Sequence, residues 1–482
     1  MNTEHFTVSI NDESFAYDVR SLLRAFFEQC EVDFVPVSDG GNPDIQDKSI
    51  DLVINISDGV ITQCYHGVTK TVPANGERSE VKNSLKLLLY DTLSEETGRV
   101  LPWGGLTGIR PVKLVMKQLE KGLSESQIHE FTASQYRVSP ARSKLAYDIA
   151  CRERVLLSDV NEDSYCLYIG IPFCPSICLY CSFSSYPIAA YKNKTDEYLS
   201  TLFKELSATA KMFEGRTLDS IYIGGGTPTS LSAEQIFHLL NHVKNTFDLS
   251  KLREWTIEAG RPDSLTPEKL KRIRCVGDLR ISINPQTFWQ KTLDIIGRAH
   301  TTDDVISAYN MAREFDFSCI NMDLIVGLPG EREAEVSYTL NKVLELAPDN
   351  LTVHSLALKR ASRLSETLKS YSGDSFFQSE AIMELVHGAA NSLDMKPYYL
   401  YRQKDIAGNL ENIGFAPYGK EGIYNILIME EVVDIAACGA GGVSKRIYNS
   451  NKPQRAANVK DVDQYISRID EMIDRKRRLY LA

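Results

Sequence analysis

Hydrophobic and polar positions follow two different rhythms along this chain. In residues 1–160, short β-rich runs precede segments in which apolar residues recur every three to four positions, which is typical of helices. The predicted strands cover 6–10, 33–37, 51–56 and 60–65. The predicted helices cover 80–93, 111–121 and 140–157. This pattern indicates a separate α+β domain over residues 1–160.

From residue 161 onward, strands and helices alternate, with six strands and helices between them. The strands are expected at 166–171, 220–223, 254–259, 278–283, 319–326 and 350–356. The helices are expected at 195–213, 233–246, 266–274, 302–315 and 332–346. Connections of this length join parallel strands through right-handed crossovers. The pattern predicts an α/β fold, either an open doubly wound sheet or a barrel. Six units fall short of the eight that close a barrel, so a partial (β/α)6 barrel over residues 161–375 is favoured.

Residues 376–482 have a mixed pattern that predicts a C-terminal α+β extension on the substrate side. We expect a helix at 379–392, a strand at 397–401, and a pair of strands around 424–429 and 433–437. A last helix begins near Asp461 and has one apolar face, as expected for a helix that packs on a core.

Composition and charge narrow the functional classes. The 482 residues are 43% hydrophobic and carry a net charge of −10, which excludes a disordered or fibrous chain. No apolar run approaches the ~20 residues needed to cross a bilayer, and the start has neither a basic segment nor an apolar stretch after it. We therefore expect a cytoplasmic protein without a membrane partner. The absence of a basic stripe argues against nucleic-acid binding.

Three of the ten cysteines stand apart from the others. Cys174, Cys178 and Cys181 form a C-x3-C-x2-C run directly after the first predicted barrel strand. The other seven are scattered among apolar neighbours and are predicted to be buried reduced thiols. Three thiolates in one loop can surround a small inorganic centre. Zinc is an alternative, but a closed zinc site needs four ligands and position 183 is Phe183. An iron–sulfur cluster with one open iron is favoured.

The segment from Tyr168 to Phe183 resembles the cluster loop of radical S-adenosylmethionine (SAM) enzymes. It is most similar to the oxygen-independent coproporphyrinogen III oxidase (coproporphyrinogen dehydrogenase) family, and the chain as a whole to its HemZ-type subgroup. The resemblance implies that Cys174, Cys178 and Cys181 hold a [4Fe-4S] cluster whose open iron is chelated by SAM.

Further motifs at predicted strand ends match the same family. They are Gly224-Gly225-Gly226-Thr227-Pro228, Glu258, Gln286 in Asn284-Pro285-Gln286, Arg298, and Asp323 in the Asp-Leu-Ile-Val-Gly-Leu-Pro-Gly run. The resemblance implies that the SAM-binding residues are Tyr168, Gly224, Gly225, Gly226, Thr227, Glu258, Gln286, Arg298 and Asp323. No catalytic residue is assigned beyond the cluster and SAM ligands. We expect the Asp323 carboxylate to face a ligand or Arg298, because it interrupts an apolar strand.

The sequence departs from the family pattern in three places. Gly170 replaces the usual histidine, Phe183 replaces a fourth cysteine, and Gly260-Arg261 follows Glu258 in place of the usual Asn-Pro continuation.

As the resemblance implies, the expected reaction belongs to haem and porphyrin biosynthesis. Two propionates of coproporphyrinogen III become vinyl groups, giving protoporphyrinogen IX, after a SAM-derived 5′-deoxyadenosyl radical abstracts hydrogen. The expected partners are a tetrapyrrole substrate and a low-potential electron donor. The substrate is expected near Tyr398, Tyr399, Tyr401 and Arg402, which offer aromatic surface and a positive charge.

Two alternatives to this reaction stay open. One is a haem chaperone of the same family, although its C-terminal H-N-x-x-Y-W motif is missing, because no histidine follows His387 and no tryptophan follows Trp289. The other is a radical SAM enzyme that acts on a different tetrapyrrole.

Overall fold

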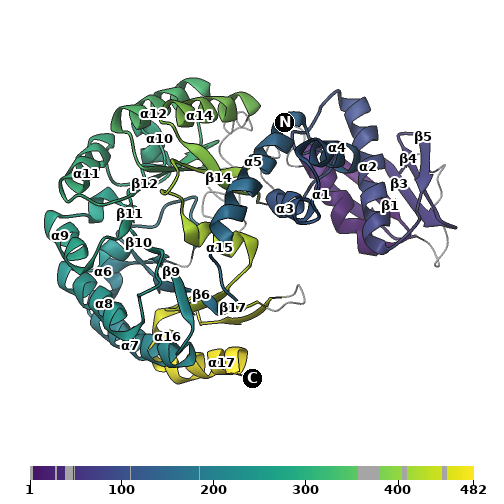
Figure 1. The fold of residues 1–482 in the computed structure, drawn as a ribbon. Coiled ribbons are helices and arrows are strands. Elements are labelled where there is room, and N and C mark those ends of the chain that lie inside the picture. The colour runs from purple at the N-terminus through teal and green to yellow at the C-terminus, as the bar shows by residue number, and fades with distance from the viewer. Residues whose placement is uncertain are drawn as a thin grey trace.

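The computed structural model consists of one large curved sheet with helices on its outer side and a smaller N-terminal sheet beside it (Figure 1). It describes residues 4–27, 30–37, 47, 49–108, 110–183, 185–356, 379–403, 410–447 and 453–481. The predicted boundary at residue 375 lies outside these residues. Within them, no helix has the length and apolar character that crossing a membrane requires.

The N-terminal sheet has the strand order β2-β1-β3-β4-β5. Its strands are β1 (His5–Ile10), β2 (Glu31–Val35), β3 (Leu52–Ser57), β4 (Val60–Tyr65) and β5 (Val68–Pro73). Two helices, α1 (Ala16–Phe26) and α2 (Arg78–Thr97), share one hydrophobic core with it. The four predicted strands and the first predicted helix are confirmed, whereas α1 and β5 were not predicted.

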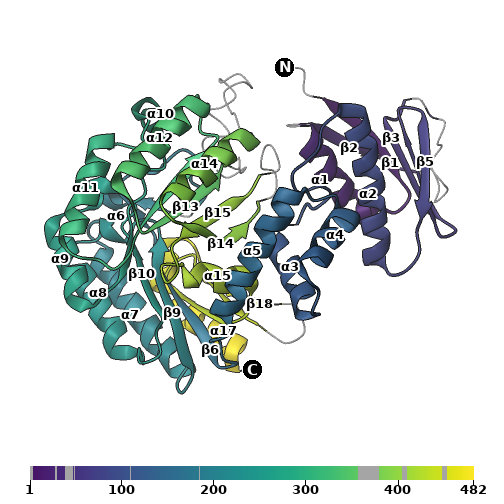
Figure 2. The ribbon, with the colours of Figure 1, turned by 45° about the horizontal axis from the view of Figure 1, so that its top comes forward.

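Three helices connect this sheet to the large one (Figure 2). They are α3 (Pro111–Glu120), α4 (Glu125–Tyr136) and α5 (Pro140–Leu157). Trp103 and the buried side chains of all three helices belong to the hydrophobic core of the large sheet, whereas the core of the small sheet ends at Leu101. Helix α4 was not predicted.

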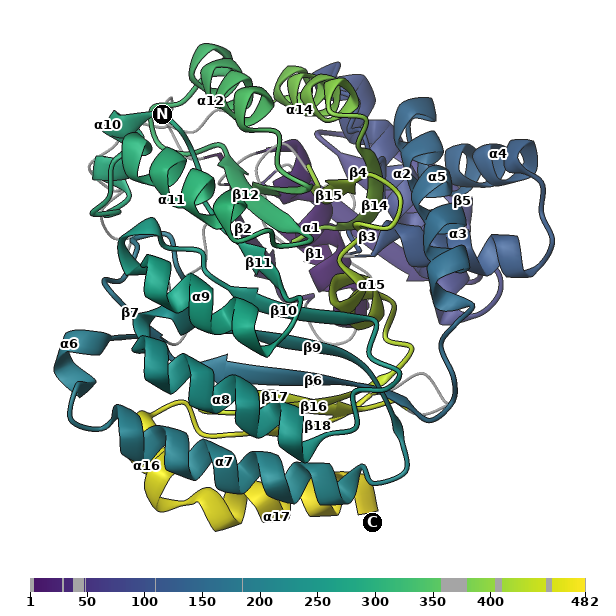
Figure 3. The same ribbon diagram turned by 60° about the vertical axis from the view of Figure 1, so that its left-hand side comes forward.

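The six predicted barrel strands are confirmed as adjacent parallel strands. They are β6 (Ser164–Ile171), β9 (Thr217–Gly225), β10 (Glu254–Glu258), β11 (Arg280–Ser282), β12 (Ile320–Val326) and β13 (Asn350–Ser355). Figure 3 shows helices along their outer side. These are α7 (Thr195–Met212), α8 (Ala233–Thr246), α9 (Pro267–Val276), α11 (Thr302–Glu314) and α12 (Glu333–Leu346). The sheet does not close into a barrel, because β14 and β18 end its strand order.

C-terminal segments extend this sheet at both edges. On the β13 side lie the antiparallel strands β15 (Asn412–Ala416) and β14 (Lys396–Tyr401). On the β6 side, β16 (Asp434–Cys438) runs parallel to β6 and is followed by β17 (Val443–Arg446) and β18 (Gln454–Ala457). The C-terminal helices are α14 (Glu380–Ser392), α15 (Ile423–Glu430), α16 (Val462–Ser467) and α17 (Ile469–Leu481).

The prediction of a strand at 424–429 is wrong, because this segment forms helix α15. Its apolar, partly β-branched sequence favours a strand locally. Tertiary contacts decide otherwise, since Glu254 accepts a hydrogen bond from Ile423 N at the start of the helix. At the other end, Arg110 and Lys113 of the N-terminal region donate to the carbonyl oxygens of Met429 and Glu430.

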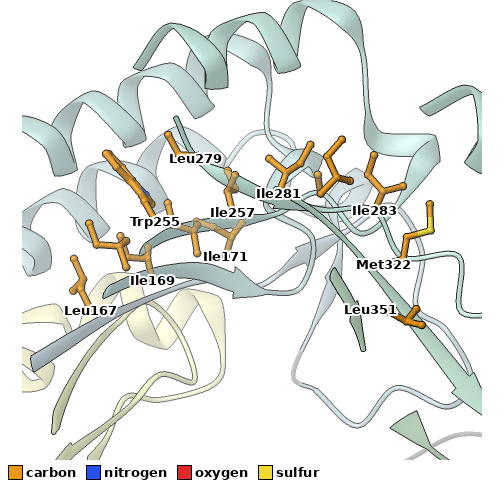
Figure 4. Close-up of a cluster of buried hydrophobic side chains, with 14 of the residues drawn as sticks. Leu167, Ile169, Ile171, Trp255, Ile257, Leu279, Ile281, Ile283, Met322 and Leu351 are labelled. Atoms are coloured by element: carbon orange, nitrogen blue, oxygen red, sulfur yellow. The ribbon is translucent and has the colours of Figure 1, made fainter. Parts of the chain in front are cut away.

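Alternation along the barrel strands separates a hydrophobic core from a polar interior. Side chains such as Ile169, Ile257 and Ile281 are buried on the outer side of the sheet, where the helices pack (Figure 4). Their neighbours in sequence point the opposite way, as expected for a strand. Polar groups from all six strands therefore line the concave side.

Candidate cofactor and substrate site

A cavity of about 500 Å³ lies on the concave side of the large sheet. Eleven of the twelve residues that the sequence singles out line it. They are Tyr168, Cys174, Cys178, Cys181, Gly225, Gly226, Thr227, Glu258, Gln286, Arg298 and Asp323. The exception is Gly224, which lies directly beneath the cavity wall. The structure thus brings together segments that are up to 155 residues apart in sequence.

The three cysteines occupy the loop that follows β6. Cys174 ends the short strand β7 (Phe173–Cys174), Cys178 is buried, and Cys181 is half-buried. All three are free thiols. Burial raises the pKa of Cys174 and raises that of Cys181 to about 11. The Cys174 and Cys181 thiols are therefore neutral on their own at pH 7, and become thiolates only when a metal centre takes the place of the proton.

The glycine turn after β9 packs tightly against the cysteine loop. Gly225 has a φ of 108°, which disfavours other residues. A Cβ atom at Gly226 would lie 2.6 Å from the carbonyl oxygen of Phe173 and 3.0 Å from Cys174 Sγ. Thr227 donates a hydrogen bond to the same sulfur at 3.5 Å. The turn therefore needs glycine in order to approach Cys174 this closely.

Glu258 faces the cavity from the end of β10 and accepts a hydrogen bond of 2.6 Å from Tyr222. Burial raises the pKa of Glu258 to about 7, against the opposing effect of this hydrogen bond. A Cβ atom at Gly224 would lie 2.8 Å from both Glu258 Cδ and the Tyr222 ring. Gly224 therefore contributes by leaving room for the pair.

Gln286 and Arg298 leave buried polar atoms without partners. Gln286 has a φ of 66°, unusual for this residue type, and backbone hydrogen bonds to Asp323 and Ile325 of β12 hold it there. Its Oε1 atom and the Arg298 Nε atom are buried without a hydrogen-bond partner in the described part of the chain. A buried polar atom of this kind is costly unless a ligand satisfies it.

Asp323 faces the cavity, as expected, but does not pair with Arg298. Its carboxylate accepts a hydrogen bond of 2.7 Å from Asn321, two residues earlier on β12. Arg298 donates instead to the carbonyl oxygen of Asn284. The sequence left two partners open for the Asp323 carboxylate, a ligand or Arg298. The geometry rules out Arg298, so a ligand is the partner that is still expected.

Helix α15 lines one end of the cavity. The sequence prediction missed this contribution, because it assigned a strand to residues 424–429. Tyr424 stacks on Tyr222 with ring centroids 4.7 Å apart, and Tyr168 lies 6.4 Å from both rings. Asn425, Ile428 and Met429 of the same helix also face the cavity. Alternation along β9 was the one sequence signal that could have identified Tyr222 as inward-facing.

Of the four residues expected near the substrate, the structure places the three tyrosines in the cavity wall. Tyr398, Tyr399 and Tyr401 line the cavity from β14. Arg402 points away from it and lies over the ring of Trp103, with its guanidinium donating to the Leu106 carbonyl oxygen. The expectation that Arg402 offers a positive charge to the substrate is therefore wrong, because this side chain is buried against the N-terminal region and does not line the cavity.

Two other expectations concern the remaining cysteines and zinc. Cys275, on the outer side of α9, is exposed rather than buried, and Cys151 is half-buried. In the described part of the chain, no group of three or more His, Cys, Asp or Glu side chains is arranged to hold a single metal ion. A closed zinc site needs four ligands, whereas a four-iron cluster binds each of three thiolates at a different iron.

Comparisons with known proteins agree with this geometry. Residues 168–343 match the model of the radical SAM superfamily. The oxygen-independent coproporphyrinogen-III oxidase-like protein HemZ of Bacillus subtilis is 35% identical over 97% of this chain and 96% of its own length. The chain belongs to the HemZ-type branch of the radical SAM HemN family. The cofactors of this family are a [4Fe-4S] cluster and SAM.

Other members of the HemN family are similar over a shorter part of the chain. A B. subtilis protein named heme chaperone HemW is 40% identical over 40% of this chain and 50% of its own length. The Escherichia coli oxygen-independent coproporphyrinogen III oxidase is 30% identical over 50% of this chain and 53% of its own length. The solved structure of E. coli HemN has a TM-score of 0.52 at 22% identity, covering 66% of this chain and 72% of HemN.

The residues at the cysteine end fit both cofactors of the family. Three free thiols offer the sulfur ligands that iron–sulfur clusters require. The unpartnered Arg298 Nε is a donor for a carboxylate, and the unpartnered Gln286 Oε1 is an acceptor for a hydroxyl group. SAM carries both of these groups.

Proposed function

We propose that this protein converts propionate side chains of coproporphyrinogen III to vinyl groups by radical SAM chemistry. The observation that carries the proposal is the convergence of the cysteine loop, Glu258, Gln286, Arg298 and Asp323 on one cavity. The names of the HemZ and coproporphyrinogen oxidase relatives support the choice of substrate.

In this proposal, Cys174, Cys178 and Cys181 hold the cluster and leave one iron for SAM. Arg298 binds the methionyl carboxylate of SAM, and Gln286 and Asp323 bind its ribose hydroxyls. The backbone of the turn Gly224–Thr227 binds the amino group. Bound SAM, cleaved with an electron from the cluster, would supply the radical chemistry that removes a hydrogen atom from a propionate.

The substrate then occupies the part of the cavity between the cysteine end and helix α15. Tyr168, Tyr222 and Tyr424 form stacked rings there, and Tyr399 and Tyr401 lie with nearly parallel rings 6.2 Å apart. Flat aromatic faces suit a macrocycle built of pyrrole rings. Glu258 also faces this space and, with a pKa near 7, is able to give or take a proton at neutral pH.

The test is product analysis after anaerobic reconstitution with iron, sulfide, a strong reductant, SAM and coproporphyrinogen III. We expect protoporphyrinogen IX, 5′-deoxyadenosine and CO2 from the wild-type protein and none of them from Cys178→Ala. Substrate-dependent deoxyadenosine without a decarboxylated product would instead indicate a different tetrapyrrole substrate.

Haem binding is the second candidate function, because the chain is 40% identical to the protein named heme chaperone HemW over 40% of the chain's own length. Tight haem binding without substrate-dependent SAM cleavage in the same assay would favour this function and contradict the proposed reaction.

A further inference from the structure

Arg261 is the residue at which the chain departs from the family pattern after Glu258, and the structure places it beside the cysteine loop. It lies between β10 and a short 3-10 turn (Pro262–Ser264) and is 3% exposed. Its side chain lines the cavity at the cysteine end. The radical SAM motifs discussed so far leave it without a role.

The contacts of Arg261 fix its guanidinium against the loop. The Asp263 carboxylate accepts hydrogen bonds from Nε and one terminal nitrogen at 2.9 and 2.7 Å. On the other side, the guanidinium donates to Ser176 Oγ at 3.0 Å and to the Ser176 carbonyl oxygen at 3.3 Å. It also donates to Cys178 Sγ at 3.5 Å. Of the described residues, Arg261 is the one cation that donates to a sulfur of the triad.

The electrostatic surroundings strengthen this contact. Cys178 and Arg261 are both buried, so water screens their interaction little. Arg298 is a second buried cation at this end, and Asp263 offsets one of the two positive charges. His300 adds no charge at neutral pH, because burial lowers its pKa to about 4.

We propose that Arg261 sets the reduction potential of the cluster through its charge and its hydrogen bond to Cys178 Sγ. This inference rests on the proposed assignment of Cys174, Cys178 and Cys181 as cluster ligands. Adding an electron makes the cluster and its sulfurs more negative. A fixed cation and an N–H donor at one sulfur stabilise the reduced form more than the oxidised form. Arg261 therefore raises the potential and eases reduction by a low-potential donor.

A purely structural role for Arg261 makes a different prediction. As a link between Asp263 and Ser176, the side chain would hold the loop in place, and its loss would lower cluster content or protein stability. The midpoint potential of the clusters that do assemble would not change. Measuring the potential together with iron and sulfide content separates the two roles.

The test compares Arg261→Met with Arg272→Met, which removes the same charge at a surface pair with Glu234 far from the cysteine loop. Each reconstituted protein, without SAM, is titrated anaerobically with titanium(III) citrate while the reduced cluster is followed by electron paramagnetic resonance. In Arg261→Met we expect the ratio of reduced to oxidised cluster at a fixed potential to fall at least tenfold. For a one-electron couple this equals a shift of about 59 mV to lower potential. Arg272→Met should match the wild type.

Arg261→Lys and Arg261→Gln extend the test to variants that keep part of the side chain's chemistry. Lysine keeps the charge and glutamine keeps only a neutral donor, so the midpoint should fall in the order Arg, Lys, Gln, Met. Full iron content with an unchanged midpoint in Arg261→Met would overturn the inference. A lower cluster content in all three variants, with an unchanged midpoint potential in the clusters that do assemble, would also overturn the inference. That result would assign a structural role to Arg261.

The assignment of the cluster ligands is checked in the same series by Cys178→Ala. A cluster that persists in Cys178→Ala would contradict the proposed ligands themselves. Loss of the cluster there, with an unchanged midpoint in Arg261→Met, would contradict only the role of Arg261.

Discussion

Single polar atoms at the cysteine end reveal where a ligand belongs. Gln286 Oε1, Arg298 Nε and Asn284 Oδ1 are buried and lack partners in the described part of the chain. Each such atom costs about 1–3 kcal/mol if nothing satisfies it. They lie in one cavity wall, and Gln286 itself has a positive φ, which indicates a site preorganised at the expense of stability.

Replacing Arg298 or Gln286 by alanine should weaken SAM binding to the reconstituted protein by about 1–3 kcal/mol for each lost contact. Iron and sulfide content should stay at the wild-type level, because neither side chain contacts a sulfur of the triad. Isothermal titration calorimetry under anaerobic conditions measures the affinity, with Arg272→Ala as the control. An unchanged affinity in Arg298→Ala would mean that this arginine does not bind SAM.

Glu258 predicts a pH dependence of stability. Its pKa rises from 4.5 in the unfolded chain to about 7 in the folded protein, mainly through burial. The folded state therefore binds this proton more tightly, and the resulting stabilisation is complete below pH 4.5 and lost as the pH rises through 7. The loss amounts to about 3 kcal/mol.

Glu258→Gln stays neutral at every pH and isolates this effect. The free energy of unfolding of the wild type, minus that of Glu258→Gln, should fall by about 3 kcal/mol between pH 4.5 and pH 8. Urea unfolding of the cofactor-free proteins measures it. Glu331, whose pKa burial also raises to about 7, is present in both proteins and cancels. A difference that does not vary with pH would show that folding leaves the pKa of Glu258 unchanged.

At the scale of elements, most of the barrel follows from its own sequence. Alternation along the strands is enough to place Ile257 toward the helices and Glu258 toward the interior, and the strand-end motifs then meet by topology alone. The strand expected at 433–437 is present as β16, but helix α15 and the pairing of β16 with β6 do not follow in this way. They depend on partners such as Glu254, Lys113 and β6, which are more than 160 residues away in the chain.

The segment that follows β16 packs closely against Gly170 of β6, and this contact requires glycine at position 439. The segment that follows β16 passes directly beside Gly170, so that a Cβ atom at Gly439 would lie 2.2 Å from the Gly170 carbonyl oxygen. Tyr198 fixes the same place by donating to that oxygen at 2.7 Å and accepting from Ala440 N at 3.1 Å. A Cβ atom at Gly170 itself would make ordinary contacts, 3.4 Å from the Tyr168 ring and 3.5 Å from the Cys438 carbonyl oxygen, so this packing does not explain the replacement of the family histidine.

The docking of the last helix on α7 depends on a fully buried ion pair. Lys476 Nζ of α17 lies 2.7 Å from Glu205 Oε1, and Tyr465 and Gly439 N also donate to this carboxylate. Lys476→Met leaves Glu205 as an uncompensated buried charge, which should lower the free energy of unfolding by about 3–5 kcal/mol. Arg475→Met, on the exposed side of the same helix, should cost less than about 1 kcal/mol. Equal effects in chemical unfolding would contradict this account of α17.

At the scale of the whole molecule, the hydrophobic cores divide the chain near residue 101. Helices α3 to α5 pack into the core of the large sheet, and Arg152 of α5 binds Glu421 and the Lys396 and Ala416 carbonyl oxygens. The predicted domain boundary at residue 160 stays a prediction. We propose that α3 to α5 form one folding unit with the large sheet.

Truncation tests this division. A chain that begins at residue 100 should keep cooperative thermal unfolding, because the small sheet has its own core. A chain that begins at residue 161 should not, because it loses the buried side chains of α3 to α5 and every hydrogen bond of Arg152. Circular dichroism and size-exclusion chromatography compare the two. A cooperative transition in the shorter chain would favour the boundary at residue 160.

The central claim, that the cysteine triad holds the cluster at the end of this cavity, is tested most directly by iron and sulfide analysis of single alanine variants. Anaerobically reconstituted Cys174→Ala, Cys178→Ala and Cys181→Ala should each lose the [4Fe-4S] signal and all SAM cleavage. Cys275→Ala, which removes an exposed thiol on α9, should keep the wild-type content of four irons and four sulfides. Full clusters in all three triad variants would contradict the account.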